Sequence, residues 1–167
     1  MKKTIIILAS IILGGVAVDQ ISKLLVLEFM DLYDSIAIIP GVLNLTYIQN
    51  EGAAFGMLSD HRWIFMVIST VAIIGIGVYL FGFCKERMLT RVGLAMIVSG
   101  GIGNMIDRVG YGFVVDMIDF CLFEFWKWIF NVADALVCVG AGVVILGLVL
   151  DIIKESKGKK NKNDSKQ

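Results

Sequence analysis

Two aspartates at the borders of long apolar runs are the residues most able to do chemistry in this chain. Asp116 closes the stretch Val114-Val115-Asp116, and Asp134 closes Phe130-Asn131-Val132-Ala133-Asp134. A carboxylate at membrane depth is costly, so its presence indicates a functional site. When two carboxylates lie close together, one stays protonated while the other ionises. The first can donate a hydrogen bond to a carbonyl oxygen and the second can take a proton from water, which suits amide hydrolysis without a covalent intermediate.

Further polar residues fall at the same ends of the apolar runs. Three pairs have the spacing of three or four residues that places side chains on one face of a helix: Asn104 with Arg108, Asn131 with Asp134, and Asp19 with Lys23. The last pair is typical of a structural ion pair at the membrane interface.

Nearby residues have simpler interpretations. Asp107 next to Arg108 is more typical of a local charge pair than of a catalyst. Asp119 is either a rival of Asp116 or a solvated loop carboxylate. The glycines at 100, 101 and 103 are typical of close helix packing. The single histidine, His61, gives no zinc-peptidase motif.

The elements that must position these residues are membrane helices. Of 167 residues, 57% are hydrophobic and 18% are charged, and the mean hydropathy is +0.83. These values predict an integral membrane protein with one compact bundle. The formal net charge of zero gives no argument for a nucleic-acid partner, and the three cysteines form no disulfide framework or metal motif.

Four apolar runs predict four membrane spans, because a span needs about 20 mainly apolar residues. The runs cover residues 5–27, 63–84, 92–106 and 128–153. The first run, preceded by Lys2 and Lys3, resembles a signal peptide, but it lacks a small-residue cleavage site before Asp19, which favours a retained helix. We therefore expect a membrane domain over 1–153, followed by a polar, basic, disordered tail over 154–167 that faces anionic headgroups.

The distribution of lysine and arginine predicts the orientation of these spans. Both termini and the link between the second and third runs carry most of the basic residues, so we expect them to be cytoplasmic. The loops 28–62 and 108–127 then lie outside. Asp134 would lie about 9 Å into the fourth span, so that it meets Asp116 just beneath the outer surface. Alternation of Leu43, Leu45 and Tyr47 after the turn signal Pro40-Gly41 predicts a small β element in the first outer loop.

The residues alone leave two other functional classes open. A proton- or cation-conducting protein could use intramembrane aspartates, but the inner halves of the second, third and fourth runs are almost wholly apolar. A metal-dependent hydrolase could bind magnesium through oxygen ligands from Asp116, Asp119 and Asp134.

Five motifs, in order along the chain, resemble those of the bacterial lipoprotein signal peptidases, which are membrane aspartic peptidases. They are Asp19-Gln20-x-x-Lys23, Asn50-Glu51-Gly52-Ala53-Ala54-Phe55, the stretch Gly100–Arg108, Val114-Val115-Asp116, and Phe130-Asn131-Val132-Ala133-Asp134. Each motif is short, but together they cover nearly the whole chain.

The resemblance implies a fold, an activity and a set of roles. The fold would be an all-α membrane protein, a four-transmembrane-helix bundle with a small extracytoplasmic β element between spans one and two. Asp116 and Asp134 would be the catalytic pair, lined by Asn104, Arg108 and Asn131 and supported by Asp19, Lys23, Asn50 and Gly52. The enzyme would cut a prolipoprotein just before its diacylglyceryl-modified cysteine. It would need no metal or organic cofactor and be inhibited by the cyclic peptide globomycin. We also expect a monomer in contact with membrane lipids.

Overall fold

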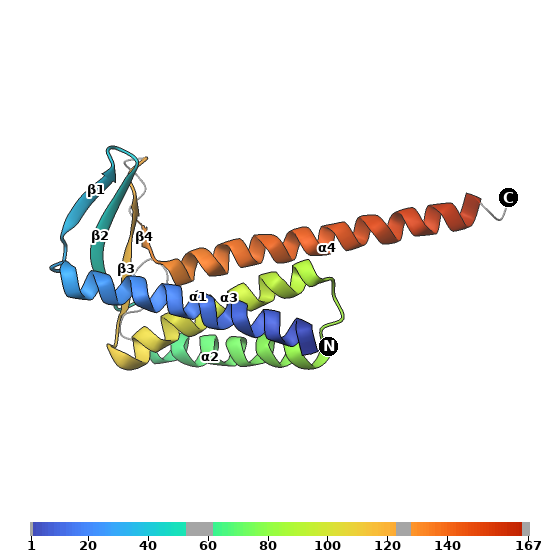
Figure 1. Cartoon of the computed structure of the whole chain (residues 1–167), viewed down its shortest axis with the longest axis horizontal. Coiled ribbons are helices and arrows are strands. Elements are labelled where there is room, and N and C mark those ends of the chain that lie inside the picture. The colour runs from blue at the N-terminus through green and yellow to red at the C-terminus, as the bar shows by residue number, and fades with distance from the viewer. Residues whose placement is uncertain (1, 53–61, 123–127, 165–167) are drawn as a thin grey trace.

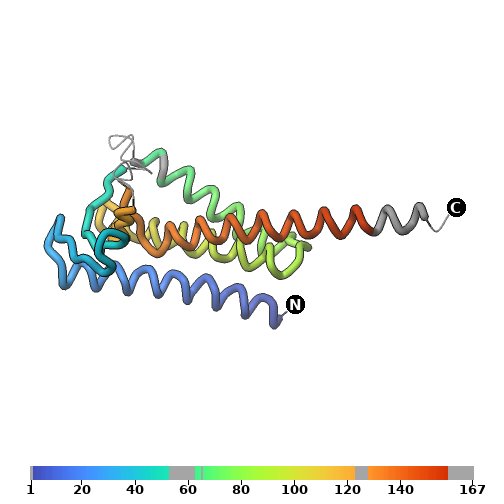
Figure 2. Tube along the Cα trace, turned by 90° about the horizontal axis from the view of Figure 1, so that it is seen from above, coloured from blue at the N-terminus to red at the C-terminus, as the bar shows by residue number. Residues whose placement is uncertain are grey.

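The computed structural model of the chain describes residues 2–52, 62–122 and 128–164. Its elements are, in order, α1 (Lys2–Phe29), β1 (Ser35–Ile39), β2 (Leu43–Asn50), α2 (Arg62–Val78), the π-helical turn η3 (Tyr79–Phe83), α3 (Met88–Gly110), β3 (Val114–Phe120), β4 (Ile129–Phe130) and α4 (Val132–Asp164). The helices run lengthwise past one another, and the strands form a sheet at one end of the bundle, called here the sheet end (Figure 1). Both ends of the chain lie at the opposite end (Figures 1 and 2).

The four predicted spans are confirmed. Within the described residues, four helices are long and apolar enough to cross a membrane: Lys2–Phe29, Met66–Phe83, Met88–Gly110 and Val132–Lys157. Their outer surfaces are apolar as well, and on α2 the side chains of Val67, Ile68, Val71 and Ile74 are each more than half exposed. Lipid tails solvate such a surface, and the helix satisfies its own backbone hydrogen bonds.

The fourth span begins and ends differently from the prediction. Ile129 and Phe130 pair with β3 as strand β4, so the helix begins at Val132 rather than at residue 128. Asp134 therefore lies in the first turn of α4 and not about 9 Å into it. The tail also differs from the expected disorder, because α4 continues through Lys154 to Asp164. Lysine and glutamate are good helix formers and extend a helix that is already nucleated.

The sheet is antiparallel with the strand order β1-β2-β3-β4. The predicted β element is confirmed as β2, but its partner β3 lies in the segment between the third and fourth spans, where no strand was expected. A bulge in β2 between Leu45 and Ile48 shifts the pairing with β3. One face of β3, with Val115 and Met117, packs against Val26 and Met30 of α1 to form a buried apolar cluster. Because side chains alternate along a strand, the opposite face of β3 carries Asp116.

Glycines bring the backbones of α3 and α4 into contact, as expected for the small residues near 100. A Cβ atom on Gly93 would lie 2.6 Å from the carbonyl oxygen of Gly140, and one on Gly100 would overlap the carbonyl oxygen of Ala133. We call this contact between Gly93, Gly100, Ala133 and Gly140 the glycine seam. It runs toward the sheet end and fixes the start of α4 against α3.

Candidate active site

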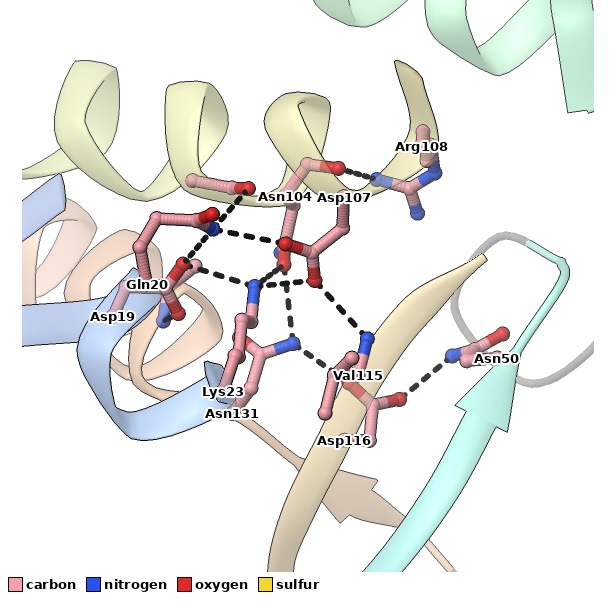
Figure 3. Close-up of polar contacts among 12 residues, drawn as sticks. Asp19, Gln20, Lys23, Asn50, Asn104, Asp107, Arg108, Val115, Asp116 and Asn131 are labelled. Carbon is pink, nitrogen blue, oxygen red and sulfur yellow. Dashed lines mark hydrogen bonds and ion pairs between the residues drawn. The ribbon is translucent and has the colours of Figure 1, made fainter. Parts of the chain in front are cut away.

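Polar side chains from three helices and two strands, together with Asn131 just before α4, meet at the sheet end (Figure 3). They come from helices α1, α3 and α4 and from strands β2 and β3: Asp19, Lys23, Asn50, Asn104, Asp107, Asp116, Asn131 and Asp134. The structure therefore brings together residues that are more than a hundred positions apart in the sequence.

Asp116 lies buried on β3 between two amide donors. Its Oδ1 accepts a hydrogen bond from Asn131 Nδ2 at 2.6 Å, and its Oδ2 accepts one from Asn50 Nδ2 at 2.9 Å. Burial raises the pKa of this carboxyl to about 7; the charge of Asp134 also raises it, while the two hydrogen bonds and the ammonium of Lys23 lower it. A carboxyl that titrates near neutral pH can both take up and release a proton during a reaction.

Asp134 is fixed by the start of its own helix. Asn131, the residue before α4, accepts a hydrogen bond through Oδ1 from the backbone N–H of Asp134 at 2.9 Å. In return, Asp134 Oδ2 accepts one from the backbone N–H of Asn131 at 3.2 Å. This reciprocal arrangement is a capping box with Asn and Asp in its two positions. Asp134 Oδ1 also accepts a hydrogen bond from Asn104 Nδ2 at 2.8 Å.

Asn131 joins the two carboxylates. The same side chain donates to Asp116 through Nδ2 and caps the N–H of Asp134 through Oδ1. Its Nδ2 also donates to Asn104 Oδ1 at 3.1 Å. Asn131 is completely buried, so these bonds are protected from water and fix the relative position of strand β3 and helix α4.

Behind Asp116 and Asp134, Lys23 forms ion pairs with two other carboxylates. Its Nζ lies 2.9 Å from Asp19 Oδ2 and 2.9 Å from Asp107 Oδ2. The expected pair of Asp19 with Lys23 is present, but it is buried inside the bundle rather than at the interface. The expected pair of Asp107 with Arg108 is replaced by the ion pair with Lys23, because successive helical side chains point about 100° apart and only Asp107 faces α1.

Arg108 connects α3 to the segment after β2. Its guanidinium donates to the carbonyl oxygen of Asn104 at 3.3 Å and to that of Gly52 at 3.4 Å. The N–H of Gly52 donates to Asn50 Oδ1 at 3.1 Å, and this orients the Asn50 amide toward Asp116. The remainder of the second motif, residues 53–55, and also His61 lie outside the described residues.

Asp119 does not join the site. It is three residues from Asp116 on one strand, so its side chain points to the opposite face of β3. There its Oδ2 accepts a hydrogen bond from Thr46 Oγ1 at 3.0 Å. The three-carboxylate arrangement considered for magnesium is therefore not assembled.

Two residues of the network had no functional role in the sequence analysis. Gln20 and Asp107 both lie within motifs, but the partners that reveal their position lie in other elements. Gln20 of α1 donates to Gly103 and Asp107 of α3. Asp107 in turn contacts Lys23 of α1 and Val115 of β3. A long-range contact of this kind leaves no local pattern, whereas the pairs three or four residues apart do.

The fold and the site together define a multi-pass membrane protein with two neighbouring carboxylates at one end of its helical bundle, one of them buried and the other half-buried. The sequence matches the family described as signal peptidase (SPase) II over residues 11–150. The chain belongs to the signal peptidase II family, and the ion-conducting alternative is not favoured.

Relatives and solved structures agree with this membership. The chain is 46% identical over 143 residues to the lipoprotein signal peptidase of Symbiobacterium thermophilum, covering 84% of this chain and 94% of that protein. It is 39% identical over 166 residues to that of Geobacter sulfurreducens, covering 95% and 99%. A solved bacterial membrane enzyme has a TM-score of 0.80 and 32% identity, over 91% of this chain and 90% of the other.

Proposed function

We propose that this chain is a membrane-embedded aspartic endopeptidase that removes the signal peptide from prolipoproteins, cutting just before the diacylglyceryl-modified cysteine. Membership of the signal peptidase II family and relatives named lipoprotein signal peptidases support the substrate class. The observation that carries the catalytic type is the pair of Asp116, which is buried, and Asp134, which is half-buried, because the single amide of Asn131 connects them.

The proposed reaction uses the two carboxyl groups in turn. The ionised carboxylate takes a proton from a water molecule as the water oxygen attacks the carbonyl carbon of the scissile peptide. The protonated carboxyl donates its proton to the carbonyl oxygen, which gives a tetrahedral diol. The proton gained by the first group then passes to the leaving nitrogen while a diol proton returns to the second group, and the C–N bond breaks. Both carboxyl groups end in their starting states.

An apolar groove at the sheet end suits the lipid part of such a substrate. The groove lies between α2 and α3, has a volume of about 480 Å³, and is lined by Thr70, Ile73, Ile74, Ile102, Met105, Ile106, Val109 and Gly110. Its α3 wall ends at the turn that carries Arg108. We place one acyl chain of the modified cysteine here, since apolar side chains stabilise it as bilayer lipid does.

The proposed orientation places the sheet end outside the cytoplasmic membrane. Lys2 and Lys3 at the start of α1 and Lys154 and Lys157 late in α4 belong to the opposite end of the bundle. So do Lys85 and Arg87 before α3 and Arg91 in its first turn, and basic residues favour the cytoplasmic side. The active site would then face the compartment that supplies water and receives the cleaved lipoprotein. We also expect a monomer in contact with membrane lipids, and the family resemblance implies inhibition by globomycin.

The direct test is cleavage of a defined substrate. The purified protein is incubated with a diacylglyceryl-modified prolipoprotein, and mass spectrometry follows a loss equal to the signal peptide. Asp116→Asn and Asp134→Asn should each reduce the rate by about 100- to 10,000-fold, which is the contribution typical of a positioned acid or base. Asp119→Asn is the matched control on the same strand and should retain turnover.

The same assay contains the results that contradict the proposal. Activity in Asp116→Asn together with an inactive Asp119→Asn would move the catalytic carboxylate to the other face of β3. Loss of wild-type activity on adding a chelator, with recovery on adding magnesium, would favour the metal-dependent hydrolase. The double variant Asp116→Asn/Asp134→Asn should be no slower than either single variant, because the two groups act as a unit.

A further inference from the structure

Two carboxylates behind the catalytic pair share the same two donors. Lys23 Nζ lies 2.9 Å from Asp19 and 2.9 Å from Asp107. Gln20 Nε2 donates to Asp19 at 3.2 Å and to Asp107 at 2.8 Å, and also to the carbonyl oxygen of Gly103 at 3.1 Å. The two carboxylates are completely buried and Lys23 is 1% exposed. A buried cluster with two negative charges and one positive charge is costly to maintain, so it calls for an explanation beyond helix packing.

Each of these carboxylates holds the backbone immediately before one catalytic aspartate. Asp107 Oδ2 accepts a hydrogen bond from the N–H of Val115 at 3.0 Å, one residue before Asp116. Asp19 Oδ1 accepts one from the N–H of Ala133 at 2.8 Å, one residue before Asp134.

Neither N–H has an evident partner in the secondary structure around it. Val115 lies opposite Gln49 of β2, but its N–H is directed at Asp107. The register of β4 with β3 covers Ile118 and Asp119 and does not include Val115. Ala133 lies in the first turn of α4, where N–H groups have no partner within the helix. The cluster therefore satisfies two N–H groups that would otherwise be buried and unpaired, and it does so next to the reacting residues.

Lys23 completes the connection through its third hydrogen bond. Its Nζ donates to Asn104 Oδ1 at 2.9 Å, and Asn104 Nδ2 donates to Asp134 at 2.8 Å. The three N–H groups of the ammonium thus go to Asp19, Asp107 and Asn104, as Figure 3 shows for the labelled residues. Two of these links lead to Asp134 and one leads to Asp116.

We propose that Asp107 and Gln20, acting with Asp19 and Lys23, are positioning residues that set the spacing of Asp116 and Asp134 through the main-chain N–H groups of Val115 and Ala133. The inference rests on the proposed aspartic mechanism. A backbone N–H held at one residue fixes the next Cα, which is 3.8 Å further along the chain. A displacement of about 1 Å at a reacting group can cost about 100-fold in rate.

The contacts of Asp107 require a side chain that only accepts hydrogen bonds. Its Oδ1 faces the Gln20 amide, while its Oδ2 faces Lys23 and the N–H of Val115. An asparagine would place an NH₂ group against one of these donors in either orientation. Rotating the Gln20 amide gives no relief, because its Nε2 also donates to Asp19 and to Gly103.

The test compares Asp107→Asn with Gln20→Met in the cleavage assay, measuring kcat and KM separately. Neither residue contacts the apolar groove, so KM should stay within about threefold while kcat falls about 100-fold for Asp107→Asn. Gln20→Met leaves both carboxylates paired with Lys23, so we expect a smaller loss of kcat, about tenfold. Gln20 is only partly buried, so this variant keeps the inference testable if Asp107→Asn does not fold.

Ser99→Ala is the matched control. Ser99 is completely buried and donates from α3 to the carbonyl oxygen of Ile12 in α1 at 2.9 Å, but it makes no link to β3 or to the start of α4. It should lower the unfolding temperature and leave kcat per folded enzyme unchanged. Wild-type kcat in both Gln20→Met and folded Asp107→Asn would overturn the inference. It would also be overturned if the two variants lost activity only in proportion to their unfolded fraction, with kcat per folded enzyme unchanged as expected for Ser99→Ala.

Failure of the inference is distinguishable from failure of the proposed mechanism. If Asp116→Asn is inactive while the two positioning variants have wild-type kcat, the catalytic pair stands and the positioning role is wrong. If Asp116→Asn is active, the aspartic mechanism itself is wrong.

Discussion

Replacing Asp116 by asparagine should remove a pH dependence from the stability of the protein. The folded protein holds this carboxyl at a pKa of about 7, against 3.8 for the same group in an unfolded chain. Between these pH values the folded state binds more protons than the unfolded state, so the free energy of unfolding falls as the pH rises from about 4 to about 7. The difference of about three pH units corresponds to about 4 kcal/mol. Asp116→Asn has no proton to lose and lacks this decrease.

The measurement is the unfolding free energy in detergent micelles at several pH values from 4 to 8, followed by circular dichroism. The change with pH is compared rather than the stability itself, because the new NH₂ group faces the donors Asn50 and Asn131 and lowers stability at every pH. Asp119→Asn controls for removing a carboxylate from the same strand. If Asp116→Asn and the wild type show the same change with pH, Asp116 ionises like an exposed carboxylate, and the argument from its burial is wrong.

Three further outcomes are expected. Asn131→Ser keeps a helix-capping oxygen but is too short to donate to Asp116, so kcat should fall about 100-fold while the unfolding free energy falls by about 2 kcal/mol or less; an unchanged kcat would show that the amide bridge is dispensable. Arg108→Lys should insert normally but lose most activity, because one ammonium cannot reproduce the two-carbonyl contact of a planar guanidinium; wild-type cleavage would leave Arg108 as an interfacial anchor. Reporter fusions after Gly110 and after Glu86 should report opposite sides, with Gly110 outside, and an inside signal at Gly110 would reverse the orientation.

Features with a local physical cause were predictable from the sequence. The thickness of a bilayer sets the length of an apolar span, so the run at 5–27 lies within α1 and the run at 63–84 ends one residue after η3. Placing a carboxylate near the membrane costs free energy, and this predicted a functional role for Asp116 and Asp134. The structure brings both residues to the sheet end. The alternation around Tyr47 predicted β2 because Tyr47, with Leu45 two residues earlier, packs into the apolar cluster on one face of the sheet.

Features created by long-range contacts were not predictable. β3 forms only because β2, 64 residues earlier by the pairing of Asn50 with Val114, lies beside it. The two residues of β4 are apolar and adjoin an apolar helix, so the sequence assigned them to that helix. Asp107 has a basic neighbour in the sequence, yet its partner in space is Lys23 from another helix. In each case the competing local interpretation was reasonable, and tertiary packing decided otherwise.

The glycine seam has a consequence for how much the active site can vary. Most helix contacts are made by side chains, which can change rotamer and absorb a small shift between the helices. Where Gly100 meets the carbonyl of Ala133, backbone touches backbone and no rotamer is available. Asn104 lies one helical turn beyond Gly100, and Asp134 follows Ala133 directly, so the separation of these two residues is set by a contact without adjustable torsions. This rigid contact between α3 and α4 thus lies next to Asn104 and Asp134, where a displacement would be most damaging. Changes in side-chain packing elsewhere in the bundle should therefore move these two residues little.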